Sequence, residues 1–385
     1  MTTFRSSDSV PLLAAGLLSA SLAFGGDAPI LHTIDSEHTG RSQTIEVSLP
    51  QAYADHAQSE FPILVVLDGE SNLDHTTAVA EYLAETGAIP DIIVVGVHAG
   101  PTRPQDFAFA PVQAGMPAEG DRYLEFVHSE VLPLVEEAYR VAPLRIISGH
   151  SLGGAFTTSL LAERPALFDA LIAQSPYLQG EFGAAILEDL QSAIGVPTPA
   201  RSFYYANLGT EPNVREAFTE LTRIVAASGT LRSFTEVHPS ETHMSTRLIG
   251  LYNGLKRFFG PDWRFDGEDV SLREHVESLS ETYGYDVLYS ESTYQQHIQR
   301  LLGSGAVHEA VNAAKLYAHQ HAHSPVPYLL LAAASARSGD IDGARAAIQV
   351  SANKYDEDPR EQWASVEGSI RALATQLGVN EHSNP

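Results

Sequence analysis

A single serine stands between glycines in the stretch Gly149-His150-Ser151-Leu152-Gly153. The apolar run 144–149 precedes it, and a segment with helical spacing follows it. This strand–turn–helix pattern predicts a sharp turn that exposes the Ser151 hydroxyl in a crevice, at the start of a helix whose dipole favours developing negative charge. We therefore predict that Ser151 is a nucleophile. The alternative is a Gly/Ser turn without chemistry.

A serine hydroxyl needs a general base to become reactive. The chain has 16 histidines. When the nucleophile lies at such a turn, the chain order is Ser, acid, His, and the base follows the last strand. His243 lies in the loop after the predicted last strand 231–238, so it is the predicted base. His238, at the end of that strand, is the alternative.

The acid of the predicted triad should follow the preceding strand, 202–209. Glu211 is the first carboxylate after it, and we predict that it orients the His243 ring and stabilises the imidazolium. An acid at a helix start is also common for structural reasons. Glu181, after the predicted strand 170–175, is the second candidate.

An oxyanion needs backbone N–H donors. The amide of Leu152 is the first predicted donor. The second is expected from the loop after the stretch LVVLDG, 64–69, where Gly69 or Glu70 is the candidate. An ordinary turn at Asp68-Gly69 is the competing interpretation.

Alternating strand and helix patterns must position these residues. Continuous β-branched runs are typical of strands buried on both faces of a parallel sheet. Together with the helical spacings they predict a doubly wound, mostly parallel α/β domain over residues 30–262. The predicted strands are 43–50, 61–69, 91–97, 144–149, 170–175, 202–209 and 231–238, and the predicted helices include 76–87, 121–139, 151–165 and 213–229.

The last third of the chain has no strand pattern. Gly305, Ala310, Ala313 and Pro325 recur 34 residues later as Gly339, Ala344, Ala347 and Pro359. This is the period of the tetratricopeptide helix–turn–helix repeat. We predict a smaller all-α, tetratricopeptide-like domain over residues 270–377, which could bind a protein or peptide partner. A generic helical tail is the alternative.

Composition limits the classes of function. The formal charge is −25 and no basic cluster stands out, which argues against nucleic acid and anionic membrane surfaces as partners. The chain has no cysteine, so disulfides, thiolate metal sites and a Cys nucleophile are excluded. The segment 319–323 contains three histidines, but a solvated cluster is favoured over a metal site. We predict neither a metal nor another cofactor.

The N-terminal residues 1–25 resemble a signal peptide. Arg5 gives a weak positive region, and residues 10–24 are apolar. Ala23 and Gly25 provide small residues at the two positions that a signal peptidase recognises. The apolar run is too short to span a bilayer. We expect an exported protein, periplasmic or secreted; the alternative is a cytoplasmic protein with a loose apolar N-terminus.

Several motifs in combination resemble the putative esterase family, which includes siderophore (enterobactin-type) esterases, feruloyl esterases and mycolyltransferases. The resemblance covers about residues 30–260. It implies an α/β-hydrolase fold and carboxylic-ester hydrolysis through an acyl-enzyme, with Ser151 as nucleophile, His243 as base and residues 68–70 as the oxyanion loop. The motifs are FPILVVLDGES, RPQDF, VLPLVEEAYRV, GHSLGGAF, QSPYL and ETHMSTRLIGLYNGLKRFF.

The family pattern R-x-D-[FL]-T-P is interrupted here, because Pro111 comes late after Asp106-Phe107. This loop is expected to border the substrate cleft. Arg103, Phe107 and Tyr177 are candidate substrate contacts, and Phe109 is a further one. The aromatic residues could equally be core, and we favour an Arg103–Asp106 ion pair over a substrate carboxylate as the partner of Arg103.

The sequence thus predicts a serine carboxylic-ester hydrolase with a Ser-His-Glu triad that acts on a small-molecule ester. Two alternatives remain open. One is an acyltransferase that uses the same site, and the other is an inactive hydrolase-fold protein that serves as a binding module through its helical tail.

Overall fold

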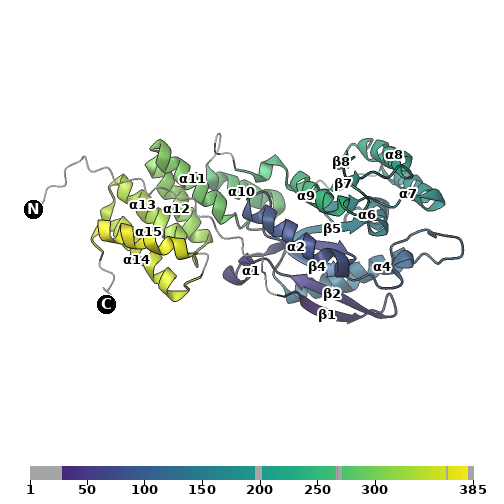
Figure 1. Ribbon diagram of the computed structural model, residues 1–385, viewed down its shortest axis with the longest axis horizontal. Helices are drawn as coiled ribbons and strands as arrows, with labels where there is room; N and C mark the ends of the chain where they lie inside the picture. The colour runs from purple at the N-terminus through teal and green to yellow at the C-terminus, as the bar shows by residue number, and fades with distance from the viewer. Residues whose placement is uncertain (1–27, 196–201, 266, 268–270, 361–362, 380–385) are drawn as a thin grey trace, which may run out of the picture. The chain divides into compact units, whose positions relative to one another are not determined.

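The computed structural model describes residues 28–195, 202–265, 267, 271–360 and 363–379. The predicted signal peptide, residues 1–25, lies outside these ranges. Two compact units are present (Figure 1). The unit with the sheet contains Gly26–Arg264 and Ser278–Leu288, and the helical unit contains Phe265–Glu277 and the chain from Tyr289 onward. The return of residues 278–288 to the sheet unit was not anticipated from the sequence.

A single eight-stranded sheet forms the centre of the first unit, in the order β1-β2-β4-β3-β5-β6-β7-β8. The six strands from β4 to β8 in this order pair in parallel, while β1 and β2 form an antiparallel edge. This is the mostly parallel α/β-hydrolase-like sheet that the strand patterns predict. The strands are β1 Ile30–Asp35, β2 Ser42–Ser48, β3 Phe61–Leu67, β4 Ile93–Val97, β5 Val141–His150, β6 Ala170–Gln174, β7 Phe203–Leu208 and β8 Arg232–Val237.

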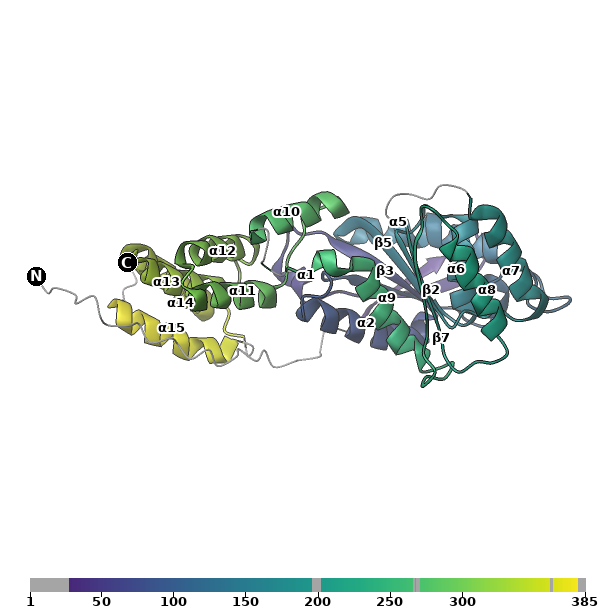
Figure 2. The ribbon, with the colours of Figure 1, turned by 90° about the horizontal axis from the view of Figure 1, so that it is seen from above.

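The apolar runs of the central strands are buried along their whole length in β3, β4, β6 and β7. Both faces of these strands are covered by helices, which is why the runs are continuous rather than alternating. Figure 2 shows α2 and α9 on one side of the sheet and α6, α7 and α8 on the other. These helices are α2 Gly69–Glu85, α6 Leu152–Glu163, α7 Gly180–Ala193, α8 Arg215–Ala226 and α9 Thr246–Phe259.

The predicted helix 121–139 is divided. A π-helical turn, Val127–Val131, separates α4 (Gly120–Phe126) from α5 (Leu132–Ala138). Apolar residues of all three pieces, such as Phe126, Val131 and Val135, belong to the main core cluster and are fully buried. The remaining helical segments of this unit are α1 Ala52–Asp55, α3 Arg103–Asp106 and a 3-10 turn, Pro261–Trp263.

The C-terminal region is helical from α10 to α15, as the absence of a strand pattern predicts. Of the four pairs related by the 34-residue offset, the glycine and alanine pairs match, whereas Pro325 is buried directly before α13 and Pro359 is exposed and five residues before α15. Gly305 and Gly339 both end a helix in the left-handed region, with φ of 83° and 88°, and Ala310 and Ala344 are both fully buried. These pairs are compatible with a repeat, and its assignment to the tetratricopeptide class stays a prediction. The helices are α10 Leu272–Tyr283, α11 Glu291–Ser304, α12 Val307–Gln320, α13 Val326–Ser338, α14 Ile341–Glu357 and α15 Ala364–Leu377.

Within the described ranges, no helix has the length and the apolar character needed to cross a lipid bilayer.

Candidate active site

Ser151 lies at the turn between β5 and α6, at the carboxyl end of the central parallel strands. Its backbone has φ 60° and ψ −117°, a conformation that non-glycine residues rarely adopt. Its N–H donates to the Gln174 carbonyl at 3.0 Å, and its own carbonyl accepts from the Tyr177 N–H at 2.9 Å. Strained conformations that the surroundings hold in place are typical of functional sites.

The glycines around Ser151 permit this turn. A Cβ atom on Gly149 would lie 2.3 Å from the Gly153 carbonyl oxygen, and one on Gly154 would lie 2.9 Å from the Gln174 carbonyl oxygen. Both contacts are shorter than real Cβ atoms tolerate, so side chains at these positions would force the strand and the helix apart. The glycine spacing that we identified in the sequence therefore has a steric cause.

His243 and Glu211 form a close pair. Nδ1 of His243 lies 2.6 Å from Oε2 of Glu211. An ionised carboxylate can only accept, so Nδ1 carries the hydrogen and the other nitrogen, Nε2, is unprotonated in the neutral ring. The His243 side chain is 36% exposed, whereas that of Glu211 is 12% exposed. The ring thus has the tautomer and the access that a general base needs.

Glu211 is held by more than the histidine. Ser175 donates its hydroxyl to Oε1 of Glu211 at 2.7 Å, and the Gly209 N–H donates to the same oxygen at 3.3 Å. Burial alone would raise the pKa of Glu211, but the hydrogen bonds from His243 and Ser175 outweigh it, so the pKa is lowered. Glu211 therefore stays ionised near neutral pH.

His150 links Ser151 to His243, because it directly precedes Ser151 in the chain and its side chain contacts His243. The ring centroids of His150 and His243 are 4.5 Å apart, and Nε2 of His150 lies 2.7 Å from the His243 carbonyl oxygen. The described part of the chain contains no hydrogen bond between the Ser151 hydroxyl and the His243 ring. Serine–base hydrogen bonds are often loose in unliganded enzymes and shorten when substrate binds.

The predicted oxyanion donors lie in the first turns of two helices, where N–H groups have no partner within the helix. Leu152 begins α6, and Gly69 and Glu70 begin α2. The two helix starts are adjacent, because a Cβ on Gly153 would lie 3.4 Å from Oδ2 of Asp68. Asp68 itself is left-handed, with φ 57°. Gly69 must be glycine, because a Cβ there would lie 2.5 Å from the Gly96 backbone.

The expected Arg103–Asp106 ion pair is wrong. Arg103 instead binds Asp68 through two nitrogens, with one bond of 2.7 Å, and also donates to the His150 carbonyl at 3.2 Å. Asp106 is paired with Arg41 and accepts from the Thr102 hydroxyl at 2.8 Å. Arg103 thus joins the loop before α2 to the strand before Ser151. Its role as a substrate contact stays a prediction.

Phe107 is completely buried, so its ring is not exposed to a substrate. It packs against Tyr123 and Phe156, with ring centroids 5.2 and 5.8 Å apart, so the core interpretation holds for it. Phe109 is half-buried and stacks on Phe156. Tyr177 is half-buried, and its N–H donates to the Ser151 carbonyl. It therefore lies beside Ser151 and stays a candidate substrate contact.

The second candidates for base and acid have other contacts or are exposed. Nε2 of His238 is 3.6 Å from a Glu236 oxygen, and Glu181 is an exposed residue in the first turn of α7. Among the described residues, no group of three or more His, Asp or Glu side chains is arranged to hold a metal ion. His321 of the histidine-rich segment is buried, with Nε2 2.8 Å from the Tyr289 carbonyl oxygen.

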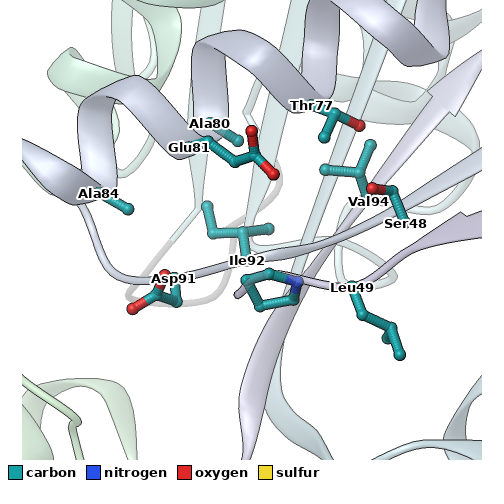
Figure 3. A pocket seen from close by; sticks show the side chains of 10 residues that line it. Ser48, Leu49, Thr77, Ala80, Glu81, Ala84, Asp91, Ile92 and Val94 are labelled. Atoms are coloured by element: carbon teal, nitrogen blue, oxygen red, sulfur yellow. The ribbon is translucent and has the colours of Figure 1, made fainter. Parts of the chain in front are cut away.

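A small pocket on the other end of the sheet is not part of this site. Figure 3 shows it between α2 and the start of β4, with Thr77 and Glu81 on the helix side and Ile92 and Val94 opposite. Because β4 and β5 are both parallel to β3, the start of β4 lies at the amino ends of the strands, whereas Ser151 lies at their carboxyl ends. Burial raises the pKa of Glu81.

Sequence reasoning missed three residues of the site. These are His150, Ser175 and Thr246, to which no role in the site was assigned from the sequence. Thr246 is completely buried and donates its hydroxyl to the His243 carbonyl at 2.8 Å. Ser175 follows β6 and Thr246 follows His243, so their place at the carboxyl edge of the sheet was the available signal.

Comparisons with known proteins agree with this architecture. Residues 36–218 match the family described as "Putative esterase". A curated relative, the ferri-bacillibactin esterase BesA of Bacillus subtilis (strain 168), is 27% identical over 164 residues, which cover 37% of this chain and 56% of the relative. The chain thus spans about half the length of this curated relative.

Two solved structures share the fold. An IroE-like serine hydrolase from Shewanella oneidensis superposes on this chain with a TM-score of 0.62 at 23% identity. The match covers 76% of this chain and 99% of the hydrolase chain. The siderophore hydrolase EstB from Aspergillus nidulans has a TM-score of 0.54 at 21% identity and covers 63% of this chain and 97% of its own.

Proposed function

Because residues 36–218 of this chain belong to the putative esterase family, we propose that the protein is a serine carboxylic-ester hydrolase whose triad is Ser151, His243 and Glu211. The observation that carries the proposal is the conjunction of the strained Ser151 turn with the 2.6 Å His243–Glu211 pair at the same edge of the sheet. Neither element alone would suffice, since strained turns and His–carboxylate pairs both occur without catalysis.

The reaction would begin with attack of Ser151 Oγ on the ester carbonyl carbon. His243 Nε2 takes the hydroxyl proton, and Glu211 stabilises the imidazolium that forms. The carbonyl oxygen becomes an oxyanion, held by the amide of Leu152 and that of Gly69 or Glu70. Collapse of the tetrahedral intermediate breaks the ester bond, and the imidazolium gives its proton to the leaving alcohol. Water then attacks the acyl-enzyme by the same steps and releases the carboxylic acid.

The Ser151→Ala variant tests this role. We expect kcat for p-nitrophenyl acetate to fall by about 10³-fold or more, because no nucleophile remains. Ser148→Ala is the matched control, since Ser148 lies on the same strand, is buried and accepts a hydrogen bond from Gln174. Unchanged turnover in a folded Ser151→Ala protein would end the assignment.

The ester class of the substrate is a further part of the proposal. The relatives include a ferri-bacillibactin esterase and a siderophore hydrolase, so a catecholate triester belongs in the first panel of substrates, beside a feruloyl ester and simple acyl esters. A glycerol or sugar acceptor in the same assay separates acyl transfer from hydrolysis. Labelling by a fluorophosphonate probe separates either activity from an inactive binding module, which would not react.

A further inference from the structure

His150 contacts the loop of the proposed base in two ways. Its ring lies against the ring of His243, with centroids 4.5 Å apart and an interplanar angle of 45°. Its Nε2 lies 2.7 Å from the His243 carbonyl oxygen. A carbonyl oxygen can only accept, so Nε2 of His150 carries the hydrogen and donates it. One side chain therefore fixes both the backbone and the ring face of His243.

The environment of His150 favours this neutral donor form. The residue is 6% exposed. Burial lowers the pKa of His150 to about 4, and the nearby His243, Arg247 and Arg103 add to this effect, although the bond to the His243 carbonyl opposes it. An uncharged His150 does not repel the imidazolium that His243 must become during catalysis.

His150 is also fixed from the opposite direction. Its carbonyl oxygen accepts from Arg103, whose guanidinium binds Asp68 at the start of the oxyanion loop. His150 precedes the nucleophile directly in the chain. It therefore lies at the junction of three parts of the site: the nucleophile turn, the base loop and the oxyanion loop.

We propose that His150 is a positioning residue, which holds His243 at the distance and orientation from which it can accept the Ser151 proton. This inference rests on the proposed function. Proton transfer in a serine hydrolase needs the base within hydrogen-bonding reach of the hydroxyl, and small misplacements are costly. The His243 carbonyl has a second donor, Thr246, but that hydroxyl does not reach the ring face. Of the two donors to the His243 carbonyl, only His150 also contacts the His243 ring.

The test separates the donor from the ring. His150→Gln keeps an N–H donor at about the same distance from the backbone, whereas His150→Phe keeps an aromatic ring and loses the donor. We expect His150→Phe to lower kcat for a p-nitrophenyl ester by about 10- to 100-fold with little change in KM. His150→Gln should recover most of this loss. The rate of fluorophosphonate labelling should follow kcat, because labelling also needs the activated serine.

His321→Phe is the matched control. His321 is also buried, donates from the same ring position to a backbone carbonyl and lies edge-on to Tyr317 at 5.3 Å. It should lower the melting temperature without lowering kcat. The inference fails if folded His150→Phe keeps kcat within about twofold of the parent, or if the Phe and Gln variants lose activity equally. If His150→Phe does not fold, His150→Gln decides, since a folded Gln variant with more than about a tenfold loss contradicts the donor role.

The proposed function and the inference fail in different ways. If the parent protein hydrolyses no ester and takes up no fluorophosphonate, the function itself is wrong. If the parent is active and Ser151→Ala is not, but the His150 variants behave like the parent, only the positioning role is wrong.

Discussion

Each of the two compact units contains a histidine beside a glutamate, and the two pairs are built differently. In the sheet unit, His243 and Glu211 are 2.6 Å apart and the ring is 36% exposed. In the helical unit, Nδ1 of His321 is 3.8 Å from a Glu291 oxygen, and its side chain is 5% exposed. Nε2 of His321 donates to the Tyr289 carbonyl, so in the neutral ring the hydrogen is on the nitrogen that faces away from Glu291, whereas in His243 it is on the nitrogen that faces Glu211.

The difference separates a structural histidine–glutamate pair from one that can do chemistry. The carboxylate of Glu291 accepts from the Tyr317 hydroxyl, and that ring stacks on Tyr294 at 4.9 Å. All of these contacts satisfy buried polar groups and stabilise the helix packing. At His243 the carboxylate binds one nitrogen only, and a strained serine lies one residue beyond its neighbour His150. The hydrogen bond from the ring to its carboxylate and the nearby strained serine, rather than the pair itself, distinguish the proposed catalytic site.

Removal of the two histidines gives the largest expected contrast. His243→Ala should lower kcat by about 10³-fold or more, because the proposed general base is lost, while its structural cost is small for a half-exposed ring. His321→Ala should leave kcat within about twofold and lower the melting temperature, because a buried hydrogen bond and a packed ring are lost. Ester hydrolysis and thermal unfolding of both variants check this. Equal losses of kcat would contradict the contrast between the two pairs.

Replacement of the two glutamates should give a smaller contrast. Glu211→Gln keeps the shape of the side chain but removes the charge that stabilises the imidazolium, so we expect kcat to fall by about 10²- to 10⁴-fold. Glu291→Gln should leave kcat unchanged and destabilise the helical unit, since Tyr317 loses a charged acceptor. A folded Glu211→Gln protein with more than half of the parent activity would favour a Ser–His dyad or another acid.

The sequence predicted the scaffold better than the details of the site. Buried strands can be recognised from their continuous apolar runs, and the order of strand ends along the chain identified Ser151, His243 and Glu211 as residues of one sheet edge. Side-chain partners depend on distances that no local pattern encodes. Arg103 therefore was expected beside Asp106, three residues away, whereas the fold brings it to Asp68, 35 residues earlier.

The missed and open assignments have a common physical cause. For Phe107 the sequence left the cleft and the core equally open, because it lies in a loop with a broken family pattern, and the structure places its ring in the core beside Phe156. His150 was overlooked because its own position is determined by strand β5, while its partner, the His243 loop, comes from 93 residues later in the chain. Long-range contacts of this kind become visible only when the fold is known.

The smallest expected difference concerns acid stability, and it compares the buried His150 of the sheet unit with the half-buried His297 of the helical unit. Burial lowers the pKa of His150 and of His297 to about 4, with Arg300 adding to the effect at His297. Both folded-state values lie below the value of about 6.5 in the unfolded chain, so the folded protein binds fewer protons between these limits. The stability that results is fully present above about pH 6.5 and is lost as the pH falls through about 4.

For His150, which is 6% exposed, this contribution is at most about 3 kcal/mol. His297 is half-buried and is screened by solvent, so its contribution should be smaller. We expect His150→Gln to flatten the fall of the melting temperature between pH 7 and pH 4.5 by several degrees, and His297→Gln to flatten it less. Thermal unfolding of the parent and of both variants at pH 7.0, 5.5 and 4.5 measures this. A parallel fall in all three proteins would show that other groups control acid stability in both units.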